Sequence, residues 1–69
     1  MNTFGERLKN LRIEEHMTQK QLAKRLGITN MAVCYYERDK RNPSLEVLRS
    51  ICKCFNVSSD YLLGLKERE

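Results

Sequence analysis

Residues 18–38 constrain the fold of this chain more than any other segment does. The tetrad Thr-Gln-Lys-Gln at 18–21 has the T-x-x-Q form of a capping box, which predicts the start of a short helix. Gly27 follows, and glycine readily adopts the left-handed conformation that ends a helix. Thr29 then caps a second short helix. Two short helices joined by such a tight turn must pack on each other, and the small side chain of Ala23 allows a close approach.

The rest of the chain predicts three more helices. A T-x-x-E capping box at 3–6 starts a helix with Phe4, Leu8 and Leu11 on its apolar face. Ser44 caps a fourth helix, whose apolar stripe is formed by Leu45, Leu48, Ile51, Cys52 and Phe55. Ser58 or Ser59 caps a short fifth helix that ends at Gly64. We therefore expect an all-α, five-helix single domain over residues 1–69, with its core in 4–64 and a frayed tail at 65–69.

The charge of the chain is concentrated in its middle third. The net charge is +4, and residues 18–41 hold six Lys or Arg against two acidic residues, whereas the segments on either side are neutral. A localised basic patch is typical of a phosphate-binding surface. Charge alone also fits a solvated basic face without a partner, so it leaves these two interpretations open.

The titratable residues argue against catalysis and metal binding. His16 is the only histidine, and the spacing of Cys34, Cys52 and Cys54 suits neither a disulfide framework nor zinc. The sequence shows no signal peptide and no apolar run long enough to span a bilayer. We expect a cytoplasmic protein with reduced thiols that is not an enzyme and needs no cofactor, metal, membrane or small-molecule ligand.

Five linked motifs carry a resemblance to a known family. They are T-Q-x-x-L-A at 18–23, L-G-I at 26–28, Tyr-Glu at 36–37, N-P-S at 42–44 and Y-L-L-G at 61–64. In this order and spacing the chain, from Phe4 to Gly64, resembles the Cro/C1-type (XRE) helix-turn-helix regulators, such as the DNA-binding domains of lambdoid phage repressors. The resemblance implies a lambda-repressor-like fold and a transcriptional regulator that binds a two-fold DNA operator as a homodimer. Such a regulator represses or activates transcription, and we expect a repressor.

The second helix of the pair is the expected reading helix. Its outward residues are predicted to contact base edges in the major groove: Asn30, Met31, Cys34 and Tyr35. An Asn amide can pair with adenine, and Met or Tyr can contact a thymine methyl. A second set is predicted to contact phosphates: Gln19, Thr29, Arg38, Lys40, Arg41, Asn42 and Ser44. For each residue, helix capping or ordinary solvent exposure is the alternative.

Two further roles concern structure and assembly. The resemblance implies a partly buried salt bridge between Arg12 and Glu37, which would orient the reading helix. Three apolar residues are left over once the core is filled, and we predict that Leu63, Leu65 and Val47 form the dimer contact. Their alternative role is that of scattered exposed apolar residues.

Other functions remain open at this stage. A protein-interaction module, such as an antitoxin or antirepressor, would bind its partner without dependence on salt or DNA sequence. The length favours a regulator without an effector domain, and the N-terminal domain of a longer repressor is the alternative.

Overall fold

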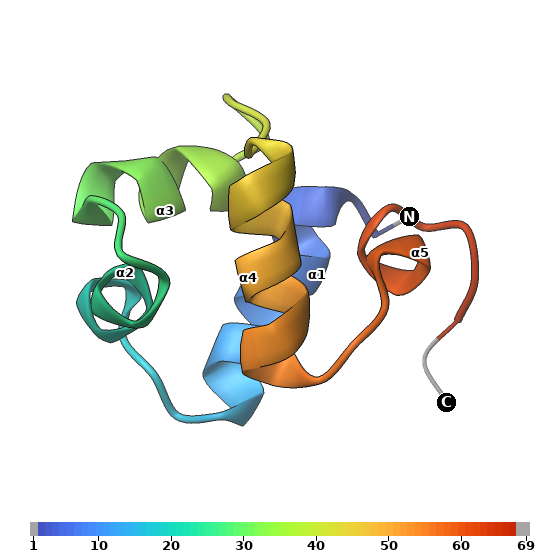
Figure 1. Ribbon diagram of the computed structural model, residues 1–69, viewed down its shortest axis with the longest axis horizontal. Coiled ribbons are helices and arrows are strands. Elements are labelled where there is room, and N and C mark those ends of the chain that lie inside the picture. Colours follow the sequence, from blue (N-terminus) through green and yellow to red (C-terminus); the bar gives the residue numbers. More distant parts are fainter. Residues whose placement is uncertain (1, 68–69) are drawn as a thin grey trace.

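The computed structural model describes residues 2–67, which contain five helices and no strand. The helices are α1 (Phe4–Glu14), α2 (Gln19–Leu26), α3 (Asn30–Glu37), α4 (Leu45–Phe55) and α5 (Ser59–Leu62) (Figure 1). The predicted all-α architecture is therefore confirmed. No helix within residues 2–67 combines the length and the apolar character that a membrane span needs.

Every helix begins after a hydroxyl residue that caps it. The side-chain oxygen accepts a hydrogen bond from the backbone N–H three residues later, at 3.0–3.2 Å, for Thr3, Thr18, Thr29, Ser44 and Ser58. A cap of this kind satisfies one of the backbone donors that the first turn of a helix leaves unpaired. Gly27 ends α2 with φ 70°. Local sequence signals thus set the helix boundaries.

One apolar core joins all five helices. Its fully buried side chains are Leu8, Leu11, Leu22, Val33, Ile51 and Leu62. Ala23 of α2 is also buried, and Ile28 in the turn packs against the same core. Burying one such aliphatic side chain contributes about 1.5–3 kcal/mol. The core therefore fixes α3 through its inner face and leaves its outer face to solvent.

The apolar stripe predicted for α4 is wrong at one residue. Leu45 is 81% exposed, whereas Val47, expected outside, packs against the core. At about 100° per residue, Val47 lies roughly 40° from the fully buried Ile51 around the helix, but Leu45 lies roughly 120° away. Leu45 also occupies the first turn of α4, directly after the cap at Ser44.

Helices α3 and α5 lie on different sides of the molecule (Figure 1). In Figure 1, α4 runs through the middle, with α2 and α3 on one side of it and α5 on the other. The outer edge of α3 and the loop that follows it lie at the same end of the molecule (top in Figure 1).

The expected frayed tail falls partly on residues 68–69, which lie outside the described residues. Leu65 N donates to Asp60 O at 2.7 Å.

Candidate nucleic-acid interface

The carboxylate of Glu37 joins the first three helices. Arg12 Nε donates to Glu37 Oε2 at 2.6 Å and Arg12 Nη2 donates to Oε1 at 3.0 Å. Gln19 Nε2, at the start of α2, donates to the same Oε1 at 3.0 Å. The Glu37 side chain is 3% exposed and that of Arg12 is 12% exposed. Because Glu37 is the last residue of α3, these bonds fix the end of α3 against α1 and α2.

Arg12 also reaches the turn between α1 and α2. Its Nη1 donates to Met17 O at 2.8 Å, so the guanidinium bonds two carboxylate oxygens and one carbonyl. The hydrogen bonds that Arg12 donates to Glu37 raise the pKa of Arg12 above its ordinary value, although burial acts in the opposite direction. A charge this enclosed orients its neighbours more than it adds net stability, because desolvation offsets much of the attraction.

A second link between α1 and the end of α3 was not predicted from the sequence. Asp39 accepts hydrogen bonds from Thr3 Oγ1 at 2.6 Å and from Gly5 N at 2.9 Å. A Cβ on Gly5 would lie 2.6 Å from both the Glu37 and the Tyr36 carbonyl oxygens, so α1 and α3 meet backbone to backbone here. A glycine inside the first turn of a helix was the one sequence signal for this contact, because glycine there needs a packing reason.

The predicted base-reading residues occupy the outer face of α3 to different degrees. Asn30 is exposed at the first position of the helix and Met31 is 63% exposed. Cys34 and Tyr35, about one turn further on, are half-buried. Within residues 2–67 none of these four side chains has a hydrogen-bond partner. The face therefore has donors and acceptors that the fold itself does not use.

The predicted phosphate-binding cations lie after α3. Arg38 is its exposed C-cap, and Lys40, Arg41 and Asn42 are exposed in the following loop. The Arg38 cation lies at the negative end of the helix dipole, which is a structural reason for its position. The guanidinium of Arg41 lies over the ring of Tyr35, 5.1 Å from its centroid. The loop therefore folds back toward the outer face of α3.

Three predicted phosphate ligands also have a structural role. The hydroxyls of Thr29 and Ser44 cap α3 and α4, and each retains one proton that can be donated to an anion. Gln19 uses one amide N–H on Glu37, which leaves its second N–H. A phosphate at these positions would meet a helix N-terminus and its free backbone N–H groups.

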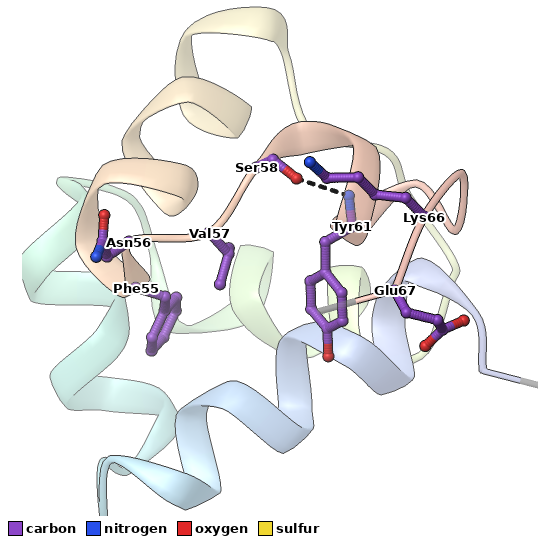
Figure 2. A pocket seen from close by; sticks show the side chains of 7 residues that line it. All are labelled: Phe55, Asn56, Val57, Ser58, Tyr61, Lys66 and Glu67. Atoms are coloured by element: carbon purple, nitrogen blue, oxygen red, sulfur yellow. Dashed lines mark hydrogen bonds between the residues drawn. The ribbon is translucent and has the colours of Figure 1, made fainter. Parts of the chain in front are cut away.

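The surface around α5 carries an open pocket and exposed apolar residues. Arg7 in α1 is buried, stacks on Tyr61 at 4.8 Å from the ring centroid, and lies 3.7 Å from Glu67. Figure 2 shows Tyr61 beside an open pocket of about 400 Å³ between the end of α4 and α5, lined by Phe55, Asn56, Val57, Ser58, Tyr61, Lys66 and Glu67. Leu63 and Leu65, two of the predicted dimer contacts, come directly after α5 and are 55% and 72% exposed.

The remaining titratable candidates do not form a cluster. Among residues 2–67, no group of three His, Cys, Asp or Glu side chains is arranged to hold a metal ion. Cys52 is half-buried against the core, and burial raises the pKa of its thiol. His16 lies in the turn after α1 with φ 57°.

Comparisons with known proteins agree with this arrangement. The Helix-turn-helix family model matches residues 8–62. The HTH-type transcriptional regulator ImmR of Bacillus subtilis (strain 168) is 43% identical over 65 residues, which cover 94% of this chain and 51% of ImmR. The HTH-type transcriptional activator BcrR of Enterococcus faecalis is 39% identical over 64 residues, which cover 93% of this chain and 31% of BcrR. The chain thus spans about half or less of these two relatives.

Solved structures share the fold closely. The P22 c2 repressor in complex with a synthetic operator has a TM-score of 0.87 and 33% identity, covering 91% of this chain and 96% of that chain. The restriction-modification controller protein C.AhdI from Aeromonas hydrophila has a TM-score of 0.79 and 30% identity, covering 87% and 91%. The family match, the five capped helices and the α2–α3 pair agree: the chain belongs to the Cro/C1-type (XRE) helix-turn-helix family of DNA-binding transcriptional regulators.

Proposed function

We propose that this protein is a sequence-specific repressor that binds double-stranded DNA as a two-fold dimer and reads the major groove with α3. One observation carries the proposal. The outer face of α3 offers Asn30, Met31 and Tyr35 without hydrogen-bond partners within residues 2–67, directly beside the exposed cations Lys40 and Arg41. Base-reading groups bordered by phosphate-binding cations are what a DNA-reading helix needs.

The proposed contacts divide into two chemical classes. Asn30 and Met31 at the start of α3 reach base edges, with Cys34 and Tyr35 next along the same face. Phosphates are bound by Gln19, Thr29, Arg38, Lys40, Arg41, Asn42 and Ser44, which surround the N-termini of α2, α3 and α4 and the loop after α3. The regulator works in the cytoplasm and needs no cofactor, and its partner is the operator DNA rather than a substrate.

The dimer follows from the small size of one reading helix. A two-turn helix reads only a few base pairs, which is too few to discriminate against a genome. Two copies joined through the α5 side would place their reading helices about one DNA turn, ~34 Å, apart, which suits a domain 28 Å long. Leu63 and Leu65 supply exposed apolar surface there. Val47 contributes less than predicted, because it packs against its own core.

The decisive experiment selects bound duplexes from a random pool and then measures affinity against salt concentration. We expect one enriched, two-fold sequence, and a slope of log affinity against log salt of about −4 or steeper per dimer. Asn30→Ala should cost about 1–3 kcal/mol on the enriched sequence and little on random DNA. A slope near zero with no enriched sequence would instead favour a protein-binding module and refute the proposal.

A further inference from the structure

Two neighbouring cations of the loop after α3 have different surroundings. The guanidinium of Arg41 lies over the Tyr35 ring at 5.1 Å from its centroid, whereas no aromatic ring within residues 2–67 lies under Lys40. An Arg–Tyr contact of this geometry is attractive, because the negative face of the ring meets a weakly hydrated planar cation. From the sequence, both cations are predicted alike as phosphate ligands.

The stacked guanidinium keeps its donors available. Stacking uses the flat face of the group, and its N–H groups point outward in the plane. No acceptor within residues 2–67 bonds Arg41. The neighbouring carboxylate of Asp39 already accepts hydrogen bonds from Thr3 and Gly5. The edge of Arg41 is therefore free for an anion while its face holds the ring.

The contact also restricts Tyr35. This side chain is half-buried on the outer face of α3, one helical turn beyond Met31, and the Arg41 guanidinium covers one face of its ring. A ring held before binding loses less conformational entropy when it meets a base than a freely rotating ring does. Arg41 can thus influence which base Tyr35 accepts, without touching that base.

We propose that Arg41 and Tyr35 form one recognition unit, in which Arg41 is a positioning residue for sequence selectivity. Its face fixes the Tyr35 ring in the reading orientation, and its N–H edge binds the adjacent phosphate. This inference rests on the proposed function, since it needs a preferred DNA sequence. It separates Arg41 from Lys40, which binds phosphate as a point charge and adds no selectivity.

The test compares Arg41→Ala with the matched control Lys40→Ala. Each is measured by fluorescence anisotropy, at one fixed salt concentration, on the selected operator and on a random duplex. We expect Arg41→Ala to lower the ratio of operator to random affinity about 5-fold or more, because the Tyr35 ring of each half-site then has to be ordered when the operator binds. Lys40→Ala should weaken both duplexes by a similar factor and leave the ratio within about twofold.

Variants of Tyr35 then show whether the effect passes through the ring. In a Tyr35→Leu background the ring is absent, so Arg41→Ala should no longer change the ratio. In a Tyr35→Phe background the ring face remains, and the full effect of Arg41→Ala should return. Far-UV circular dichroism of every variant checks that the compared proteins are folded. We expect them to be, because Tyr35 and Arg41 lie outside the buried core.

Two results would overturn the inference. Arg41→Ala and Lys40→Ala with the same profile would make Arg41 a phosphate ligand only. An undiminished Arg41→Ala effect in the Tyr35→Leu background would show that the selectivity does not pass through the ring. Failure of the proposed function is a separate result, because a parent protein that prefers no duplex reveals it before any variant is made.

Discussion

Removing either member of the Arg12–Glu37 ion pair should damage the protein more than removing both. Glu37→Gln keeps the side-chain shape but leaves the Arg12 cation, whose side chain is 12% exposed, without a counterion. Stranding one charge of a buried pair costs about 3–5 kcal/mol. A domain of this size has roughly 3–5 kcal/mol of net stability, so the variant should be close to the midpoint of unfolding at 25 °C.

The burial of the two side chains predicts which single variant is destabilised more. Arg12→Met leaves the Glu37 carboxylate, 3% exposed, with only the hydrogen bond from Gln19. Because the carboxylate is the more enclosed of the two charges, Arg12→Met should cost more than Glu37→Gln. The double variant strands no charge, so it should be more stable than either single variant, which corresponds to a coupling free energy of about 3 kcal/mol or more.

The assay is urea unfolding followed by circular dichroism at 222 nm. All four proteins are measured in the same concentration of trimethylamine N-oxide, which shifts every folding equilibrium toward the native state and brings the single variants into range. Additivity within about 0.5 kcal/mol would refute the reasoning, because it would mean that the two side chains do not interact in solution.

Three further outcomes are expected. Gly5→Ala should destabilise the fold by about 1–3 kcal/mol in thermal unfolding, because the new Cβ would meet two backbone carbonyls at 2.6 Å; an unchanged midpoint would contradict that close approach. Leu63→Glu and Leu65→Glu should keep the helical spectrum but abolish cooperative occupancy of two half-sites in gel-shift titrations, and parent-like binding would place the dimer contact elsewhere. The Cys52 thiol should be alkylated by iodoacetamide more slowly than a cysteine peptide at pH 8, because burial raises its pKa and lowers its thiolate fraction; equal rates would argue against that burial.

Local features of the sequence predicted the fold well. The cap residues from Thr3 to Ser58 and the left-handed Gly27 act within one turn of the chain, so their effect can be read from neighbouring residues. The prediction for Leu45 is wrong because this residue lies in the first turn of α4 and roughly 120° around the helix from the fully buried Ile51. The choice of which residues belong to the buried face depends on where the neighbouring helices pack, and the sequence of α4 alone does not give that.

The sequence predicted the exposure of single residues in the candidate site, but it did not predict the contacts that the loop after α3 makes. The exposure of Asn30 and Met31 followed from the inward positions of their neighbours on α3. The contacts of Asp39 with Thr3 and Gly5, and that of Arg41 with Tyr35, depend on how the loop after α3 folds back. A loop with a residue at φ 57°, as Asp39 has, is set by such tertiary contacts and leaves little trace in the sequence.

Helix α3 is held at its two ends by different partners. Its start is fixed by the Gly27 turn and by packing on α2, as the helix-turn-helix pair requires. Its end is fixed by α1, through the Arg12–Glu37 pair and through the Asp39 carboxylate on Gly5 N. Hydrogen bonds have a preferred direction, so they restrict the orientation of α3 as well as its distance from the core. Apolar packing alone restricts the orientation less. The first helix, which carries no proposed DNA ligand, therefore helps to determine where the outer face of α3 lies relative to the rest of the domain.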